Sequence, residues 1–159
     1  MSKEKTMSAN QELLDYYVER YVAGDLDAVV DLYAEDAVQA MPDGFYQGRT
    51  AIRERLAREL GGAFSDLTWT VDSFVEQAGA FCDEWTMAGT HTGPLELPDG
   101  TQLPATGRRV QIKGMEFVQM RDGKIVVDNL YYDNLAVLGQ LGLVPGGVPA
   151  AAGRPEQLT

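Results

Sequence analysis

The chain has 159 residues, of which 45% are hydrophobic and 23% are charged, values typical of one soluble globular domain. Thirteen Lys and Arg against 24 Asp and Glu give a formal charge of -11, which argues against nucleic acid or an anionic membrane as partner, because both require a basic face. One cysteine and one histidine exclude an intramolecular disulfide, a cysteine-based zinc site and a two-histidine metal site. No apolar run is long enough to span a membrane and no signal peptide opens the chain, so we expect a cytoplasmic protein.

The first third of the chain favours helices. Apolar residues recur at spacings of three and four between Leu13 and Val22, as in an amphipathic helix. Gly24 is suited to end this helix and Asp25 to cap a second one. We therefore expect helices at 13–22, 26–33 and 51–60, the last capped by Thr50, with a short strand at 36–41 and a turn at 42–44.

From Leu67 the apolar period changes to two, which indicates strands. Helices followed by antiparallel strands predict an α+β fold, a cone-shaped barrel in which the helices pack on one face of a curved, mainly antiparallel sheet. The folded unit is expected at 9–143, followed by a flexible tail at 144–159 that is rich in Pro, Gly and Ala. We expect strands at 67–71, 79–88, 106–120 and 124–133, a loop at 92–105 and a last helix at 134–141.

A hairpin in this region places two acids on one face. Residues 120–124 predict a three-residue loop with Gly123 in the left-handed conformation, which sets Glu116 opposite Asp128. Alternation of side chains puts both acids among apolar neighbours. A two-residue loop would instead set Glu116 opposite Asn129.

Asp83 interrupts the alternating apolar set Phe81, Trp85 and Met87 in the same way. A buried, unpaired carboxylate is costly, and the usual escape is that one acid keeps its proton, which leaves a proton donor beside a base. General acid–base catalysis needs this division of roles. The alternative is that these strand acids lie on the solvated face of the sheet.

Several motifs resemble one known family. They are Ala23-Gly24-Asp25-Leu26-Asp27, Gly89-Thr90-His91-Thr92-Gly93, Pro104-Ala105-Thr106-Gly107-Arg108-Arg109, Asp122-Gly123-Lys124-Ile125 and Gln140-Leu141-Gly142. Over about 10–143 the chain is similar to the SnoaL-like polyketide cyclases of the nuclear-transport-factor-2-like superfamily. The resemblance implies a pocket between the helices and the concave face of the sheet, and a homodimer formed through the outer face.

Comparison with ketosteroid isomerase, another member of that superfamily, implies roles for individual residues. Tyr17 stands where the isomerase has its oxyanion-hole tyrosine, and Glu116 where it has its protonated aspartate. The base of the isomerase falls at Met41, so that role is vacant here. The resemblance therefore implies that the base has moved to Asp128 or Asp83, which stand at positions that are apolar in the isomerase.

Further side chains are candidates for contact with a substrate, although each could equally belong to the core. His91 follows Gly89-Thr90 in a turn and either holds the backbone or contacts the ligand. The other candidates for lining an apolar cavity are Met41, Trp69, Phe81, Trp85, Met87, Val118, Leu130 and Tyr132.

Two hypotheses of different class follow. The first is a cyclase or isomerase that closes a ring in a polyketide-derived intermediate, by an aldol-type reaction or by epoxide opening, with Asp128, Glu116, Asp83 and Tyr17 as catalytic residues. No phosphate loop, dinucleotide fingerprint or metal constellation occurs in the sequence, so we expect no cofactor. The second is a protein that binds a small apolar ligand or forms a dimeric scaffold, in which the acids face outward or pair with Arg108 or Arg109.

Overall fold

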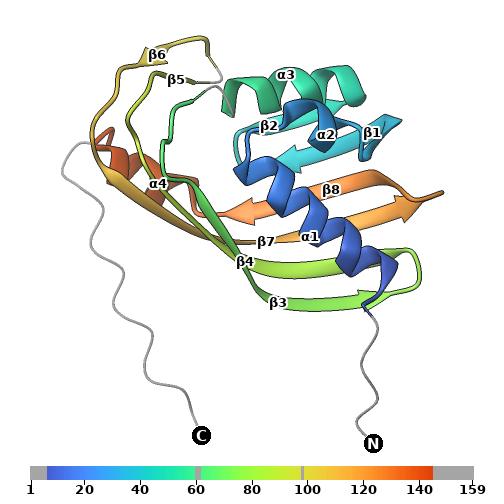
Figure 1. Ribbon diagram of the computed structural model, residues 1–159. Coiled ribbons are helices and arrows are strands. Elements are labelled where there is room, and N and C mark those ends of the chain that lie inside the picture. The colour runs from blue at the N-terminus through green and yellow to red at the C-terminus, as the bar shows by residue number, and fades with distance from the viewer. Residues whose placement is uncertain (1–6, 60–61, 98, 145–159) are drawn as a thin grey trace, which may run out of the picture.

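The computed structural model describes residues 7–59, 62–97 and 99–144. A curved sheet of six strands in the order β2-β1-β8-β7-β4-β3 forms one layer, and helices lie against its concave face (Figure 1). The predicted α+β architecture is confirmed, although the sheet is open and does not close into a barrel. The predicted tail lies, from residue 145 onward, outside the described residues. No helix within the described ranges is long and apolar enough to cross a membrane.

Capping residues mark the first turn of three of the four described helices. Ser8 caps α1 (Ala9–Val22) by accepting from the Gln11 amide, and Asp25 caps α2 (Leu26–Val30) by accepting from the Ala28 amide. Helix α3 (Arg49–Glu59) begins before Thr50, so the prediction that Thr50 caps it is wrong. Helix α4 (Asn134–Leu141) has the predicted bounds, begins after Asp133 and ends at Gly142 in the left-handed conformation.

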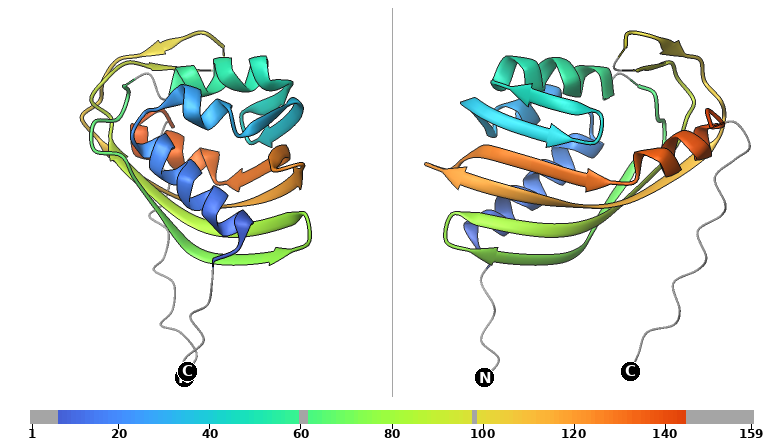
Figure 2. Two further views of the ribbon diagram at one scale, coloured as in Figure 1. Left: turned by 45° about the vertical axis from the view of Figure 1, so that its right-hand side comes forward. Right: turned by 180° about the vertical axis from the view of Figure 1, so that it is seen from behind.

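The strands of the large sheet alternate between a buried and an exposed face. They are β1 (Tyr33–Met41), β2 (Gly44–Gln47), β3 (Thr68–Gln77), β4 (Ala80–Thr90), β7 (Arg109–Arg121) and β8 (Lys124–Tyr132). Strand β1 pairs parallel to β8, and all the other pairs are antiparallel. Helix α1 crosses the concave face and α3 packs on β1 and β2 (Figures 1 and 2).

The sequence analysis missed three strands. Helix α2 ends at Val30, three residues before the end predicted from the sequence, because Tyr33 already begins β1. The predicted turn at 42–44 leads directly into the edge strand β2. The predicted loop 92–105 contains a separate hairpin of β5 (Leu95–Glu96) and β6 (Gln102–Leu103), which arches away from the large sheet (Figure 1). Strands of two to four residues are too short to show a period in the sequence.

The hairpin between β7 and β8 differs from the prediction in its register. Arg121 pairs with Lys124, so the loop has two residues, and Asp122 and Gly123 both have positive φ, at 53° and 74°. A bulge then shifts the pairing by one more residue between Gln119 and Met120. Glu116 therefore lies opposite Leu130, and neither predicted partner, Asp128 or Asn129, is correct.

Glu116 and Asp128 nevertheless point to the predicted face of the sheet. The two changes shift the strand pairing by two residues in total, and a shift of two leaves the alternation of side chains between the faces unchanged. Glu116 and Asp128 both point to the concave face, where they are 4% and 1% exposed. The bulge places Ile125 on this face, although strict alternation from Asp128 would place Val126 there.

Candidate active site

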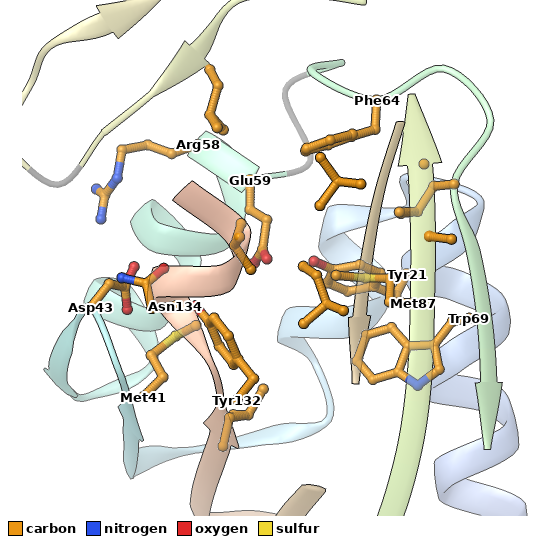
Figure 3. A pocket seen from close by; sticks show the side chains of 18 of the residues that line it. Tyr21, Met41, Asp43, Arg58, Glu59, Phe64, Trp69, Met87, Tyr132 and Asn134 are labelled. Atoms are coloured by element: carbon orange, nitrogen blue, oxygen red, sulfur yellow. The ribbon is translucent and has the colours of Figure 1, made fainter. Parts of the chain in front are cut away.

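A cavity of about 250 Å³ lies between the helices and the concave face of the sheet. Six aromatic side chains contribute to its wall, and Trp69 packs edge-on against Tyr17 and Tyr21, with ring centroids 5.9 and 4.9 Å apart. Figure 3 shows Asp43, Arg58, Glu59 and Asn134 along one side, across from Tyr21, Phe64, Trp69 and Met87. A polar wall therefore faces an aromatic and apolar one, as in many small-molecule sites.

Most of the predicted lining residues contribute to this wall. Those that do are Met41, Trp69, Trp85, Met87, Leu130 and Tyr132, and Tyr17, predicted as a catalytic residue, lies on the wall as well. Phe81 and Val118 do not, because they belong to the hydrophobic core below the cavity. His91 is fully buried outside the wall, where its Nδ1 bonds to the hydroxyl of Thr106, 3.0 Å away, and its backbone bonds to Arg108 and Gly107. This position corresponds to the expectation that His91 holds the backbone.

Asp83 and Glu116 form a carboxyl pair beneath the cavity. They are directly opposite each other on β4 and β7, and Asp83 is 2% exposed, with both oxygens lacking a partner among the described residues. Burial raises the pKa of Asp83 to about 7. Burial also raises the pKa of Glu116 well above its usual range, and the charges of Asp128 and Asp83 add to this rise. Two buried acids on directly opposite strand positions favour states in which at least one is protonated.

Asp128 is held by hydrogen bonds from strand β1. Its Oδ2 accepts from the Tyr33 hydroxyl at 2.6 Å and from Gln39 Nε2 at 2.7 Å. Burial raises the pKa of Asp128, and these two hydrogen bonds act against the rise. The strand register explains the contact, because Gln39 lies beside Asp128 in the parallel pair of β1 and β8.

Tyr17 connects this network to the cavity. Its hydroxyl lies 3.3 Å from that of Tyr33, and because Tyr33 donates its proton to Asp128, Tyr17 is the donor in this contact. A separation of 3.3 Å is long for a hydrogen bond between two hydroxyl oxygens, so this bond is weak. The Tyr17 hydroxyl can therefore donate to a stronger acceptor in its place. Tyr17 is thus a phenol on the cavity wall, backed by a buried acid through one intervening tyrosine.

The three predicted acids themselves are not part of the cavity wall. On these strands the wall begins at Trp85 on β4 and Leu130 on β8, each two residues further along its strand than an acid on the same face. The prediction that the acids face inward is therefore confirmed, but they lie under the floor of the cavity. Within the described part of the chain, no group of three or more acidic, His or Cys side chains is arranged to hold a metal ion.

The polar wall consists of residues that the sequence analysis missed. Asp43 lies in the turn after β1, half-buried, with its Oδ1 buried and without a partner among the described residues. Burial raises its pKa, while the charge of Arg55 acts against this rise. Arg55 and Glu59 of α3 form an ion pair on the same wall.

The sequence analysis interpreted Asp43 only as a turn residue. Arg55 occurs at helical spacing between Ile52 and Glu59, a signal that could have placed it on the buried face.

The predicted arginine partners of the acids lie elsewhere. Arg109 pairs with Asp66 at 2.9 Å on the surface, and Arg108 bonds to the backbone oxygen of Gln140. The arrangement expected of a protein without chemistry, with the acids outward or paired with these arginines, is therefore not found.

Comparisons with known proteins agree with the fold described above. Residues 14–127 match the family model of the SnoaL-like domain. IdmH from Streptomyces antibioticus, described as a candidate polyketide cyclase, is 26% identical, with a TM-score of 0.66 over 86% of this chain and 99% of its own. AclR from Streptomyces galilaeus, described as a candidate hydroxylase, is 24% identical, with a TM-score of 0.73 over 88% of this chain and 100% of its own. TsrD from Streptomyces laurentii is 21% identical, with a TM-score of 0.71 over 90% of this chain and 100% of its own. A search of curated proteins gave no match.

Proposed function

The chain belongs to the SnoaL-like domain family, and on this premise we propose that it is an enzyme that closes a ring in, or isomerises, a small polyketide-derived substrate by general acid–base catalysis. The observation that carries the proposal is the presence of both Asp43 and Tyr17 on the wall of one cavity that six aromatic side chains help to line. The related structure described as a candidate polyketide cyclase supports the substrate class.

Asp43 is assigned as the general base. Its unpartnered oxygen and partial burial favour proton uptake, and a base whose pKa is raised towards the working pH is a better catalyst. The carboxylate removes a proton from a carbon next to a substrate carbonyl, which forms an enolate. In a ring closure the enolate carbon then attacks a second carbonyl of the same substrate, and protonated Asp43 returns its proton to the new alkoxide.

Tyr17 is assigned as the hydrogen-bond donor to the enolate oxygen. Burial, with the charges of Asp128 and Glu116, raises the pKa of Tyr17 well above its usual value, so the phenol stays protonated. Its proton turns from the long contact with Tyr33 towards the developing oxyanion. Asp128 is then a positioning residue, because it acts through Tyr33 and does not touch the substrate.

Exchange of carbon-bound protons tests both assignments without knowledge of the natural substrate. The bicyclic ketone 2-tetralone is incubated with the protein in D2O, and deuterium uptake next to the carbonyl is followed by NMR. Asp43→Asn is expected to lower the protein-catalysed rate by about 10²- to 10⁴-fold and Tyr17→Phe by about 10²-fold.

Matched controls are available on the exposed side of α1. Asp15→Asn and Tyr16→Phe change the same functional groups away from the cavity and are expected to leave the exchange rate unchanged. If Asp43→Asn and Tyr17→Phe both exchange at the wild-type rate, the proposed mechanism is wrong. Absence of exchange in the wild-type protein would argue against enolate chemistry and in favour of epoxide opening.

A further inference from the structure

Arg55 is a buried cation that the acid–base steps do not use. It lies on α3 beside Ile52 and Leu56, both fully buried, and is itself only 5% exposed. Its side chain also contributes to the cavity wall. A guanidinium removed from water costs several kcal/mol unless it is paired and hydrogen-bonded.

The pairing of Arg55 is incomplete. Among the described residues its acceptor is Glu59, one turn further along the helix, which receives a bond from Nη1. Glu59 is 32% exposed, so solvent weakens its compensation of the buried charge. The Nε of Arg55 is buried without a partner among the described residues, although a guanidinium carries five donors.

The groups that surround Arg55 point to the ligand it would accept. The charges that face the polar wall are Asp43, Glu59 and Arg58, and the phenols of Tyr17, Tyr21, Tyr46 and Tyr132 lie around them. On the sheet side, Asp128 and Glu116 also feel the charge of Arg55. Burial works to lower the pKa of Arg55, but Glu59 and the tyrosines hold it above its usual value, so the group stays a cation.

We infer that Arg55 is the anion-binding residue of the cavity, and that its ligand is a delocalised oxyanion, an enolate or a phenolate, on an aromatic or polyketide ring system. Glu59 restrains the guanidinium and moderates its charge in the empty cavity. The cation, the Tyr17 hydroxyl and the aromatic wall then act on the same ligand: the first two on its oxygen, the third on its ring. This inference rests on the proposed function for its ligand class, but its test requires only binding.

The probe is 2-naphthol, whose neutral and ionised forms are distinguished by their absorption and fluorescence. A cation close to the bound oxygen favours naphtholate, so the wild-type protein is expected to bind naphtholate more tightly than naphthol. Arg55→Met is expected to lower the ratio of bound naphtholate to bound naphthol by about tenfold or more, since an opposite charge within a few ångströms shifts a pKa by about 1–3 units. Arg55→Lys is expected to keep most of the effect.

Glu59→Gln separates an anion site from a merely structural ion pair. Removal of the counter-ion leaves the charge of Arg55 less compensated. The ratio of bound naphtholate to bound naphthol is therefore expected to rise several-fold, whereas Arg55→Met is expected to lower it. The double variant Arg55→Met/Glu59→Gln removes both charges and guards against misfolding through an unpaired Glu59. Its ratio is expected to stay below that of the wild type.

Three controls complete the design. Arg53→Met and Glu54→Gln change exposed side chains of the same helix, and 2-methoxynaphthalene reports an intact cavity without an ionisable oxygen. The inference is overturned if Arg55→Met and the double variant keep the wild-type ratio while 2-methoxynaphthalene still binds, or if Glu59→Gln lowers the ratio as Arg55→Met does. It is also overturned if the wild-type protein binds 2-methoxynaphthalene but not naphtholate. A loss of proton exchange in Asp43→Asn tests the proposed function separately and does not depend on this result.

Discussion

Ionisable groups lie in two layers on the concave side of the sheet, one on the sheet itself and one on helix α3 and the turn after β1, and the two layers differ in whether a ligand in the cavity can reach them. The lower layer holds Asp83, Glu116 and Asp128, which are almost completely buried and lie outside the cavity wall. The upper layer holds Asp43, Arg55 and Glu59, which line the cavity. Raised carboxyl pKa values occur in both layers, so burial alone does not identify the residues that touch a substrate. Trp85 lies between the layers, on the same face of β4 as Asp83 and two residues beyond it.

The strongest test of this partition is Gly114→Ala. A Cβ at Gly114 would lie 2.5 Å from Trp85 Cζ2 and 2.8 Å from the backbone oxygen of Tyr131, and the backbone cannot give way without disturbing β8. We expect a loss of about 3 kcal/mol in the free energy of unfolding, measured by urea denaturation, because the core becomes overpacked. Trp85→Leu in the same chain should recover part of this loss. An unchanged stability in Gly114→Ala would mean that both the indole and the backbone of β8 give way easily, so that Trp85 does not form a rigid separation between the layers.

The charge state of the lower layer is expected to dominate the pH dependence of stability. The folded state raises the pKa of Asp83 to about 7, above the value in the unfolded chain, so folding favours its protonated form. The resulting stability is fully present below about pH 4 and is lost as the pH rises to about 7. Three pKa units correspond to at most about 4 kcal/mol.

Asp83→Asn should flatten this profile. We expect the variant to be more stable than the wild type at pH 8 by about 1–3 kcal/mol, with a smaller difference at pH 4. Glu116 and Asp128 also have raised pKa values, so part of the slope should remain. Asp15→Asn, on the exposed side of α1, should keep the wild-type slope. A wild-type protein whose stability increases between pH 4 and 7 would contradict the assignment.

Tyr33→Phe tests the hydrogen-bonded connection between Asp128 in the lower layer and Tyr17 on the cavity wall. The variant removes the donor to Asp128 and the acceptor of Tyr17, both buried, and we expect a loss of about 1–2 kcal/mol in stability. Proton exchange in 2-tetralone should fall by about tenfold, less than in Tyr17→Phe, because the donor itself remains but is less well oriented. An exchange rate as low as that of Tyr17→Phe would show that Tyr33 itself touches the substrate.

The sequence was informative about the lower layer and poor for the upper one, for a physical reason. Glu116, Asp128 and Asp83 lie on long strands, where alternation shows which face a residue occupies even when the register is wrong by two. Asp43 lies in a turn, and Arg55 lies on a helix in which polar residues outnumber apolar ones, so neither residue visibly interrupts an apolar pattern. Their place on the cavity wall depends on how α3 and the turn after β1 pack together, which no local period encodes.

Asp128→Asn is expected to change stability least, and it tests whether the buried charge of Asp128 in the lower layer costs free energy. Its amide oxygen can still accept from Tyr33 and Gln39, and its NH2 group takes the place of Oδ1, which has no partner among the described residues. Because a buried charge is removed while both hydrogen bonds are kept, we expect stability at pH 8 to be unchanged or raised by about 1 kcal/mol. The gain should shrink at low pH, where the carboxyl is protonated, since burial raises its pKa. A loss of more than about 1 kcal/mol at pH 8 would mean that attraction between Asp128 and the buried cation Arg55 outweighs the cost of burying the carboxylate, so that the charge of Asp128 stabilises the fold.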